Sequence, residues 1–353
     1  MTPLRRILPI VTSLAAAIIL AGCGGSSGQG DDAAGAMPAD DRLFPLVFEN
    51  DWLAVPEQGG FFQALVAGYY AEEGLAVTFR HGGPYDLTPQ NVAVGKAQIG
   101  MGGSDEIILA VGKDLPLVIV APFMQHHPYA LMSYADHAVK SFDQLEGRTV
   151  TGFPGATWIP LVQHRAKVKF GLAPLTTSIA GFMADQSHRA IEQVFITNEP
   201  YFARRQGADI HVLRIGDSGW DPYRVIFTTK PFADEHPHRV AAFVRASLRG
   251  WQAYLHGDAA AADAMIREKN PSMTQDYIDF VRQTMIASKL VTGLADQGQA
   301  DLRLDKIQQE IADLRAVKLL SADLRASDVA SLDFLPDDPR PSPPAANASA
   351  QPE

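Results

Sequence analysis

Short apolar runs typical of buried β-strands alternate with helical patterns through the middle of the chain. Several runs are apolar at every position, as in parallel sheets covered on both faces. A helical pattern from Gly60 places Phe61, Leu65 and Tyr69 on one stripe, and Gly74 ends it. We expect strands at Leu43–Phe48, Ala76–Phe79, Leu115–Phe123, Ala130–Ser133, Thr149–Phe153, Thr176–Phe182, His211–Ile215 and Val225–Thr229.

The pattern becomes almost purely helical from Pro237 onward. The length of 353 residues fits about two domains. Strands alternating with helices, and then helices alone, predict an α/β fold with a helical C-terminal part. The runs are too uneven for the eight regular strand–helix units of a TIM barrel. We expect helices at Val240–Tyr254, Ala259–Lys269, Thr274–Ser288 and Leu302–Leu314.

Charge and cysteine content exclude several classes of protein. With 40 acidic and 30 basic residues, the chain has a net charge of -10 and no basic surface for a nucleic acid. Its single cysteine excludes intramolecular disulfides, cysteine-held iron–sulfur clusters and multi-cysteine zinc sites. His126 and His127 are neighbours on an extended segment and point to opposite faces, so we predict no metal site. We also expect no cofactor.

The first 22 residues have the organisation of a secretory signal peptide. Arg5 and Arg6 precede an apolar run from Ile7 to Leu20, and small residues lead to Cys23. At about 1.5 Å per residue the run reaches about 21 Å, short of a hydrocarbon core of roughly 30 Å. Leu20-Ala21-Gly22-Cys23 resembles the lipobox of bacterial lipoproteins, which implies that Cys23 is acylated. The alternative is a soluble exported protein with a chance cysteine.

The resemblance to lipoproteins places the protein in the cell envelope, held by its lipid at the periplasmic face of a membrane. Gly24 stands where an aspartate would favour the inner membrane, so the outer membrane is weakly favoured. Residues 23–41 lack large apolar side chains and are expected to form a flexible tether. Residues 336–353 are rich in proline, alanine and serine, and we expect a disordered tail. The folded body then spans residues 42–335.

Several short motifs follow one another along this folded body. The motifs are Asp51-Trp52 with Pro56–Phe62 and Gly68–Leu75, then Gly102–Glu106, Leu145–Val150, Gly155–Thr157, Thr197–Tyr201 and Leu248–Trp251. In this order they resemble the solute-binding proteins of ABC importers, and more narrowly the group related to thiamine-pyrimidine-precursor binding and to the fungal pyrimidine synthases.

The resemblance implies a type II periplasmic-binding-protein fold, in which two α/β lobes joined by two crossovers close on a ligand by a hinge motion. We place the first crossing near Tyr129–Ala135 and the return near Asp221–Arg224. Lobe 1 would then contain residues 42–135 and 223–335, and lobe 2 residues 136–222. Open α/β sheets bind ligands at the carboxyl ends of their strands, which agrees with a site between the lobes.

Two residue pairs have the chemistry to hold a flat heterocycle. Asp51 and Trp52 lie just past the first expected strand, where the indole can stack on the ring and the carboxylate can accept from an exocyclic amine. Asn198 and Glu199 offer an amide and a second carboxylate, although Asn-Glu-Pro is also an ordinary helix start. Gln58 stands where the pyrimidine-precursor binders tend to carry histidine, which weakens a direct transfer of their ligand.

Other candidates lie at helix starts and near the expected hinge. Ser104 and Asp105 open a helix whose free N–H groups can face a ligand, and a plain capping serine is an equal alternative. Thr157 can donate and Trp158 can stack, although Trp158 is equally explained as a core residue. The remaining candidates are Gln125, His126 and Tyr223, beside the two crossings.

Three classes of function remain. The first is a monomeric, lipid-anchored protein that captures a small planar heterocyclic solute, such as a thiamine pyrimidine precursor, for an inner-membrane ABC permease and its ATPase. The second is a ligand-sensing lipoprotein without a transport role. The third is an enzyme like the pyrimidine synthases, against which export and the loss of the only cysteine to the anchor both argue. The folded body also lacks a Gly-x-Ser-x-Gly elbow, a His-Glu-x-x-His motif and a phosphate loop, so we expect no enzyme.

Overall fold

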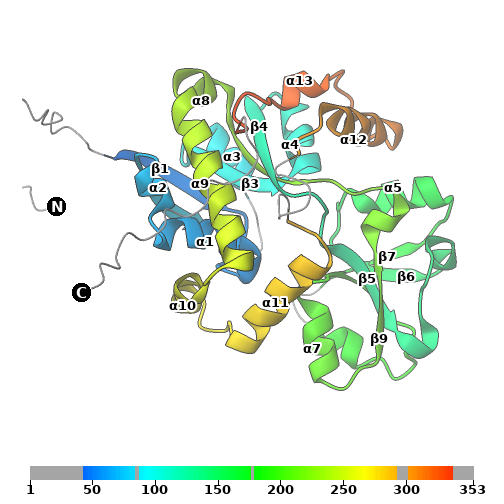
Figure 1. Cartoon of the computed structure of the whole chain (residues 1–353). Helices are drawn as coiled ribbons and strands as arrows, with labels where there is room; N and C mark the ends of the chain where they lie inside the picture. Colours follow the sequence, from blue (N-terminus) through cyan, green and yellow to red (C-terminus); the bar gives the residue numbers. More distant parts are fainter. Residues whose placement is uncertain (1–42, 84–86, 176–178, 292–300, 337–353) are drawn as a thin grey trace, which may run out of the picture. The chain divides into compact units, whose positions relative to one another are not determined.

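The computed structural model describes residues 43–83, 87–175, 179–291 and 301–336. The expected signal peptide at 1–22 and tether at 23–41 lie outside these residues, as does the expected tail from 337 onward. The described residues form two five-stranded sheets, each with its own helices (Figure 1). We call the first sheet and the helices packed on it lobe 1, and the second sheet with its helices lobe 2.

The sheet of lobe 1 has the strand order β2-β1-β3-β10-β4. Strand β1 pairs in parallel with β2 and β3, and β10 runs antiparallel between β3 and β4. Strand β4 is buried at every position, and Pro122 is tolerated because β4 is the last strand in this order. The bounds are Phe44–Asn50 for β1, Leu75–His81 for β2, Ile99–Gly103 for β3, Leu117–Met124 for β4 and Arg224–Thr229 for β10.

The sheet of lobe 2 repeats this plan with the order β7-β6-β8-β5-β9. Strand β6 is parallel to β7 and β8, and β5 runs antiparallel between β8 and β9. Strand β6 therefore holds the place in lobe 2 that β1 holds in lobe 1. The bounds are Tyr129–Tyr134 for β5, Thr149–Gly152 for β6, Gly171–Pro174 for β7, Ile191–Phe195 for β8 and Ile210–Arg214 for β9.

Helices α1 and α9 pack closely in lobe 1. A Cβ on Gly250 of α9 would lie 2.2 Å from the carbonyl oxygen of Gly60 in α1, so this crossing requires glycine. Phe48 and Phe61 pack here with ring centroids 4.7 Å apart. The helices of this lobe up to α10 are η1 (Pro56–Gln58), α1 (Gly59–Val66), α2 (Tyr69–Glu72), α3 (Thr88–Ala93), α4 (Ser104–Val111), α8 (Lys230–Glu235), α9 (Pro237–His256) and α10 (Ala260–Lys269).

Lobe 2 has shorter helices around its own core. Trp158 is fully buried, stacks on Phe170 at 6.1 Å and donates from its indole nitrogen to Gln193 at 2.9 Å. This tryptophan therefore anchors α5 against β8. The helices are η2 (Ala135–His137), η3 (Phe142–Leu145), α5 (Trp158–Ala166), α6 (Ala180–Met183), α7 (Glu199–Arg205) and η4 (Ile215–Ser218).

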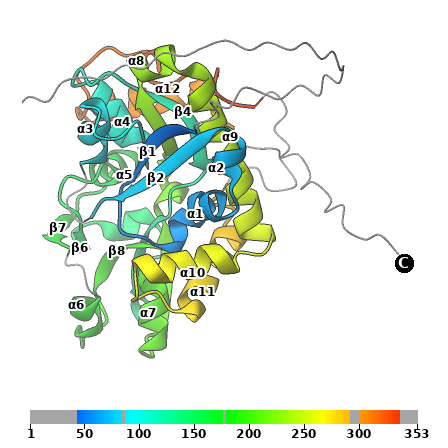
Figure 2. The same cartoon turned by 90° about the vertical axis from the view of Figure 1, so that its left-hand side faces the viewer.

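Helix α11 (Gln275–Ala287) links the helical C-terminal part to lobe 2. It packs on η1 of lobe 1, and it lies next to α7 in the views of Figures 1 and 2. The hydroxyl of Tyr277 in α11 donates to Oδ1 of Asn198 at 2.9 Å, and its ring packs 5.2 Å from that of Tyr201. Helix α11 therefore contacts both lobes.

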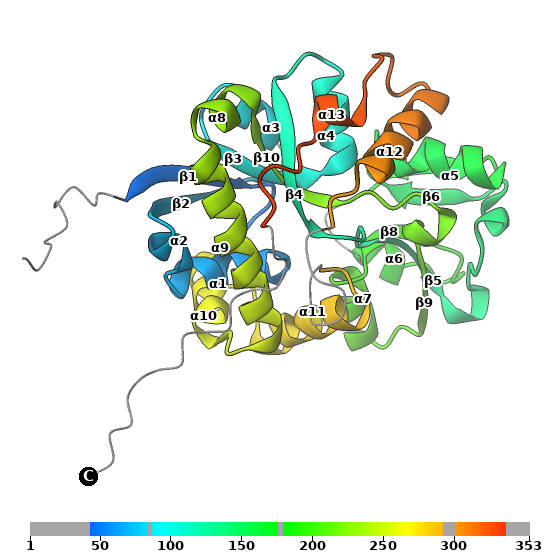
Figure 3. The same ribbon diagram turned by 45° about the horizontal axis from the view of Figure 1, so that its top comes forward.

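Helix α12 (Leu304–Ala316) also contacts both lobes. It packs on α4, beside α13 (Ala326–Val329), and extends toward α5 (Figure 3). Glu310 accepts from Ser104 of lobe 1 at 2.5 Å, and Asp313 pairs with Arg165 of lobe 2 at 2.5 Å. The C-terminal helices thus contact lobe 2 as well as lobe 1.

The structure corrects two expectations on the chain path. Strand β5 belongs to the second sheet, so the first crossing comes before Tyr129 and not within Tyr129–Ala135; the other lobe bounds remain predictions. The strand expected at Thr176–Phe182 is wrong, because α6 occupies Ala180–Met183 and the neighbouring strand is β7 at Gly171–Pro174. Residues 176–178 lie outside the described part of the chain.

Candidate functional site

The two lobes meet through residues that follow the carboxyl ends of their strands. Asp105 lies in the first turn of α4, directly after β3, and Thr157 immediately precedes α5, after β6. The hydroxyl of Thr157 donates a hydrogen bond to Oδ2 of Asp105. Both side chains are buried, so this bond joins lobe 2 to lobe 1 away from bulk solvent.

Arg224 provides the positive charge at this junction. Its guanidinium group donates to Oδ2 of Asp51, and both side chains are nearly buried. Burial alone would lower the pKa of Arg224, but the carboxylates of Asp51 and Glu106 raise it overall. Arg224 therefore stays charged and holds Asp51 in place at the end of β1.

Acids on α4 lie beside this arginine. Burial raises the pKa of Asp105, whereas the hydrogen bond from Thr157 lowers it in part. Glu106 keeps an exposed surface and accepts from the backbone N–H of Gly103 at 2.9 Å. The protein around its carboxyl group still raises the pKa of Glu106 to about 7, and the charge of Asp105 adds to this.

A second group of acids comes from η1 and α7. Burial raises the pKa of Glu57 to about 7, and repulsion from Glu199 contributes. Glu199 accepts from the backbone N–H of Phe195 at 2.8 Å and from the amide of Asn198 at 3.0 Å, while burial raises its pKa. We call Asp51, Glu57, Asp105, Glu106, Thr157, Glu199 and Arg224 together the inter-lobe site.

The chain segments between the lobes meet at Asp221. Nδ1 of His126 lies 2.5 Å from Oδ2 of Asp221, and the backbone N–H of His127 donates to Oδ1 at 2.8 Å. Nδ1 of His127 in turn accepts from the backbone N–H of Tyr129 at 3.3 Å. Burial holds the pKa of His127 well below its usual value, so this imidazole is neutral. Asp221 thus ties the outgoing crossing to the returning one.

The remaining predicted residues fall into two groups. Trp52 is 37% exposed, and Oε1 of the buried Gln58 has no hydrogen-bond partner among the described residues. Trp52 is therefore partly open to a ligand, and Gln58 offers a buried acceptor that lacks a donor.

Four other predicted residues are engaged by the protein itself. Ser104 donates to Glu310 and accepts from the backbone N–H of Tyr223 at 2.9 Å. The amide of Gln125 donates to the carbonyl of Asp301 at 3.2 Å. Tyr223 is buried beneath the ammonium group of Lys306, and Trp158 is the core residue described above. None of these four side chains offers a free polar group or a free ring face at the inter-lobe site. Their role in ligand binding stays a prediction.

Arg224, Glu57 and Phe153 are not among the candidates predicted from the sequence. Arg224 could have been noticed as a charged residue that opens an otherwise apolar run. Glu57 looks like an ordinary acid in the first turn of a helix, and no sequence signal distinguishes it. Phe153 directly follows β6 and is 42% exposed, whereas most large apolar residues of the described chain are buried.

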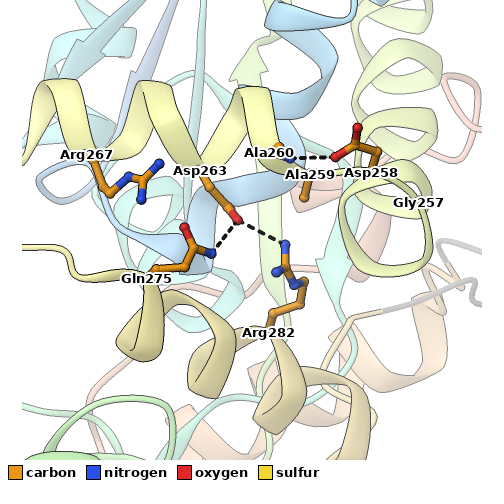
Figure 4. Close-up of a pocket in the computed structure, with 8 residues that line it drawn as sticks. All are labelled: Gly257, Asp258, Ala259, Ala260, Asp263, Arg267, Gln275 and Arg282. Atoms are coloured by element: carbon orange, nitrogen blue, oxygen red, sulfur yellow. Dashed lines mark hydrogen bonds and ion pairs between the residues drawn. The ribbon is translucent and has the colours of Figure 1, made fainter.

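A separate polar hollow of about 390 Å³ lies between α10 and α11 (Figure 4). Oδ2 of the buried Asp263 accepts there from Gln275 at 3.0 Å and from Arg282 at 3.3 Å. Its lining shares no residue with the inter-lobe site: Gly257, Asp258, Ala259, Ala260, Asp263, Arg267, Gln275 and Arg282.

The described ranges contain neither a cluster of metal ligands nor a helix that could span a membrane. In those ranges no three histidine, cysteine or acidic side chains cluster in a way that could hold a metal ion. The helices in the same ranges are also too short or too polar to cross a membrane.

Comparison with known proteins identifies the family. The NMT1/THI5 like family model matches residues 55–261, more than half of the chain. The formylaminopyrimidine-binding protein of Halalkalibacterium halodurans is 26% identical over 279 residues, covering 74% of this chain and 79% of that protein. The riboflavin-binding protein RibY of Chloroflexus aurantiacus is 25% identical over 320 residues, covering 86% of this chain and 90% of that protein.

Solved structures agree on the fold. The periplasmic aliphatic sulphonate binding protein SsuA from Escherichia coli matches with a TM-score of 0.62 at 13% identity, covering 80% of this chain and 96% of that one. At this identity the likeness concerns the fold alone. The expected two-lobed architecture is confirmed, and this chain belongs to the NMT1/THI5-like family with a type II periplasmic-binding-protein fold.

Proposed function

We propose that this protein is the lipid-anchored, extracytoplasmic solute-binding component of an ABC importer, and that its solute is a small planar heterocycle with an amino group. The observation that carries the proposal is the make-up of the inter-lobe site. Four carboxyl groups, those of Asp51, Glu57, Asp105 and Glu106, interact there with Arg224, and that of Glu199 interacts with Glu57. Carboxylates accept strongly from amino groups in a site that excludes water.

The same charges argue against an anionic solute. Arg224 is already bound to Asp51, and an anion would meet the remaining carboxyl groups. Like charges repel strongly where little water screens them, so the site selects against sulphonate-type solutes. The two sequence relatives, by contrast, are named for heterocyclic ligands, formylaminopyrimidine and riboflavin.

Two exposed aromatic rings support stacking on a flat ligand. Trp52 follows β1 and is 37% exposed, and Phe153 follows β6 and is 42% exposed. Strands β1 and β6 hold equivalent places in the two sheets. Neither ring packs against another aromatic ring within the described part of the chain, and the exposed part of each can stack on a flat ligand. A planar solute held between the lobes would then gain apolar contact from both.

Closure of the lobes is the proposed mechanism of capture. Thr157 and Asp105 bond across the junction, and Asp221 holds the two crossings together as a hinge. A ligand that contacts both lobes favours the closed arrangement over the open one. The permease would then recognise the closed, loaded form.

A binding experiment tests the proposal directly. The mature full chain, purified in detergent, is titrated with formylaminopyrimidine, riboflavin and an alkanesulphonate, and its melting temperature and binding heat are measured. We expect a heterocycle to raise the melting temperature, because a ligand that binds the native state stabilises it. Binding of the sulphonate without binding of either heterocycle would contradict the proposal.

Two further measurements address the alternative functions. Mass spectrometry of the solute after incubation separates a binding protein, which returns it unchanged, from a pyrimidine-synthase-like enzyme, which converts it. Ligand-dependent ATP hydrolysis by a cognate permease in proteoliposomes separates an importer component from a ligand sensor. We expect an unchanged solute and stimulated hydrolysis.

A further inference from the structure

We propose that Glu57 of lobe 1 and Glu199 of lobe 2 act together as acceptors for the N–H donor edge of the bound solute. This proposal rests on the proposed function and deepens it, because it names the chemical group that the site recognises. The donor edge is an amino group, alone or next to a protonated ring nitrogen. Such an edge offers N–H groups to both carboxyl groups at once.

The two carboxyl groups come from opposite sides of the junction. Glu57 lies in η1, which packs in lobe 1 before α1, and Glu199 is the first residue of α7 in lobe 2. Their charges interact, since Glu199 raises the pKa of Glu57. A group that binds both therefore contacts both lobes, which is the requirement for ligand-driven closure.

One oxygen of the Glu57 carboxyl group lacks a hydrogen-bond donor of good geometry from the described residues. Its Oε2 is buried and has no hydrogen-bond partner among the described residues. The hydroxyl of Thr197 lies close enough to lower the pKa of Glu57 but makes no hydrogen bond of good geometry. Buried acceptors without partners are rare in folded proteins because each one costs stability, and a ligand that donates would satisfy this one.

The charged and titratable groups around Glu57 do not supply the missing donors. Arg224 on β10 lowers the pKa of Glu57, but its guanidinium group donates to Asp51. Tyr277 on α11 donates to Asn198 instead. Tyr254 on α9 has a buried hydroxyl without a hydrogen bond of good geometry and lies beside Asp263 of α10. Glu199 on α7 adds a second negative charge.

Gln58 extends the same acceptor surface. Its Oε1 is buried without a partner within the described ranges, one residue after Glu57. An amide oxygen accepts but carries no charge, so it can receive an additional N–H at little cost. The set of Glu57, Gln58 and Glu199 is thus matched to a solute that donates along one edge.

The decisive experiment compares 4-aminopyrimidine with 4-methylpyrimidine, which lacks the amino group. Binding to the full mature chain is measured by calorimetry for the wild type, Glu57→Gln, Glu199→Gln and the exposed control Glu146→Gln. We expect either site variant to bind the amino ligand about ten- to hundredfold more weakly, because each variant loses a hydrogen bond to a charged group. The methyl ligand should lose less than about threefold, because it makes no such bond.

A stability measurement excludes a purely structural role. Above pH 7, where the Glu57 carboxyl group is ionised, Glu57→Gln removes a buried charge that Glu199 repels, so the ligand-free variant should melt at a higher temperature than the wild type. A structural carboxylate would give the opposite result, because its loss would leave its donors unpaired. Weaker amino-ligand binding together with higher ligand-free stability therefore supports the acceptor role.

The outcomes separate the two proposals. If the wild type binds 4-aminopyrimidine and Glu57→Gln binds it equally well, the carboxyl pair is wrong and the proposed function stands. If both ligands lose affinity equally in Glu57→Gln, the amino group is not what the pair recognises. If the wild type binds neither these probes nor the larger heterocycles, the proposed function fails and the carboxyl pair fails with it.

Discussion

The hydroxyl of Thr157 in lobe 2 donates a hydrogen bond to the carboxylate of Asp105 in lobe 1. Asp105 also interacts with Arg224, which holds Asp51 at the end of β1. One bond between the lobes is therefore connected to the acids of the inter-lobe site. Lobe closure and the charge of the site are expected to depend on each other.

Thr157→Val tests this connection, since it removes the donor and keeps the shape of the side chain. Asp105 would lose its partner from lobe 2, and we expect solute affinity to fall by about 1–3 kcal/mol. Small-angle scattering should show a larger radius of gyration for the ligand-free variant. The control is Thr149→Val, at an exposed position of β6 in the same lobe. Equal scattering and affinity in the two variants would mean that the bond does not contribute to closure.

Trp52→Ala should weaken ligand binding, whereas Trp158→Ala should lower the stability of the fold. Trp52 is exposed, so its loss should weaken binding of a planar solute by about 1–3 kcal/mol and leave the free energy of unfolding nearly unchanged. Trp158 is fully buried, and its loss should lower the free energy of unfolding by about 3–5 kcal/mol. Calorimetric titration and urea unfolding measure the two quantities. Unaltered affinity in Trp52→Ala would remove this indole from the binding surface.

The fold could be predicted where burial follows a simple pattern. Strand β4 is apolar at every position and α9 has a clear apolar stripe, so both were predicted near their true bounds. Strands β3 and β8 were missed for different reasons. Glycine makes up most of β3, and Glu192 and Gln193 interrupt the apolar run of β8. The packing of each sheet stabilises these segments despite their weak local preference.

The candidate site could be predicted only in part. Residues that follow strand ends, such as Asp51 and Asp105, are identified by the rule that ligands bind at carboxyl ends. Arg224 and Glu57 could not be assigned in this way, because their importance comes from partners far away in the sequence. Asp51 lies 173 positions from Arg224, and no local pattern connects them.

Asp221→Ala should loosen the contact between the two crossings, which we propose as the hinge. The variant removes the acceptor for Nδ1 of His126 and for the backbone N–H of His127, so two groups lose their partner. We expect the free energy of unfolding to fall by about 1–3 kcal/mol. Urea unfolding measures this loss, with Asp217→Ala at an exposed position of η4 as the control. A hinge role would be contradicted by equal stability of the two variants.

Cys23→Ser tests the lipid anchor proposed from the sequence. An acylated cysteine partitions with membranes, because each buried methylene contributes about 0.8 kcal/mol. We expect the wild type in the membrane fraction and the variant in the soluble extract. Metabolic labelling with an alkyne fatty acid should mark the wild type and not the variant. Labelling of both proteins would show that the lipid is attached at a residue other than Cys23.

The free energy of unfolding should decrease as the pH rises from about 4.5 to about 8. Burial raises the pKa of Glu310 from 4.5 to about 8 and that of Glu57 to about 7. Above pH 4.5 the folded protein therefore keeps protons that the unfolded chain has released. Stability falls with pH wherever the folded state binds more protons than the unfolded state.

Glu310→Gln isolates one of these groups. Glutamine can still accept from Ser104, but it has no proton to lose. The dependence of unfolding free energy on pH should become less steep by up to about 1.4 kcal/mol per pH unit, the amount that one proton contributes. Urea unfolding at pH 5, 6, 7 and 8 measures it, and the exposed Glu146→Gln should keep the wild-type slope. If the variant has the same slope as the wild type, Glu310 is ionised throughout this range. The effect of Lys306, which lowers the pKa of Glu310, would then outweigh the effect of burial.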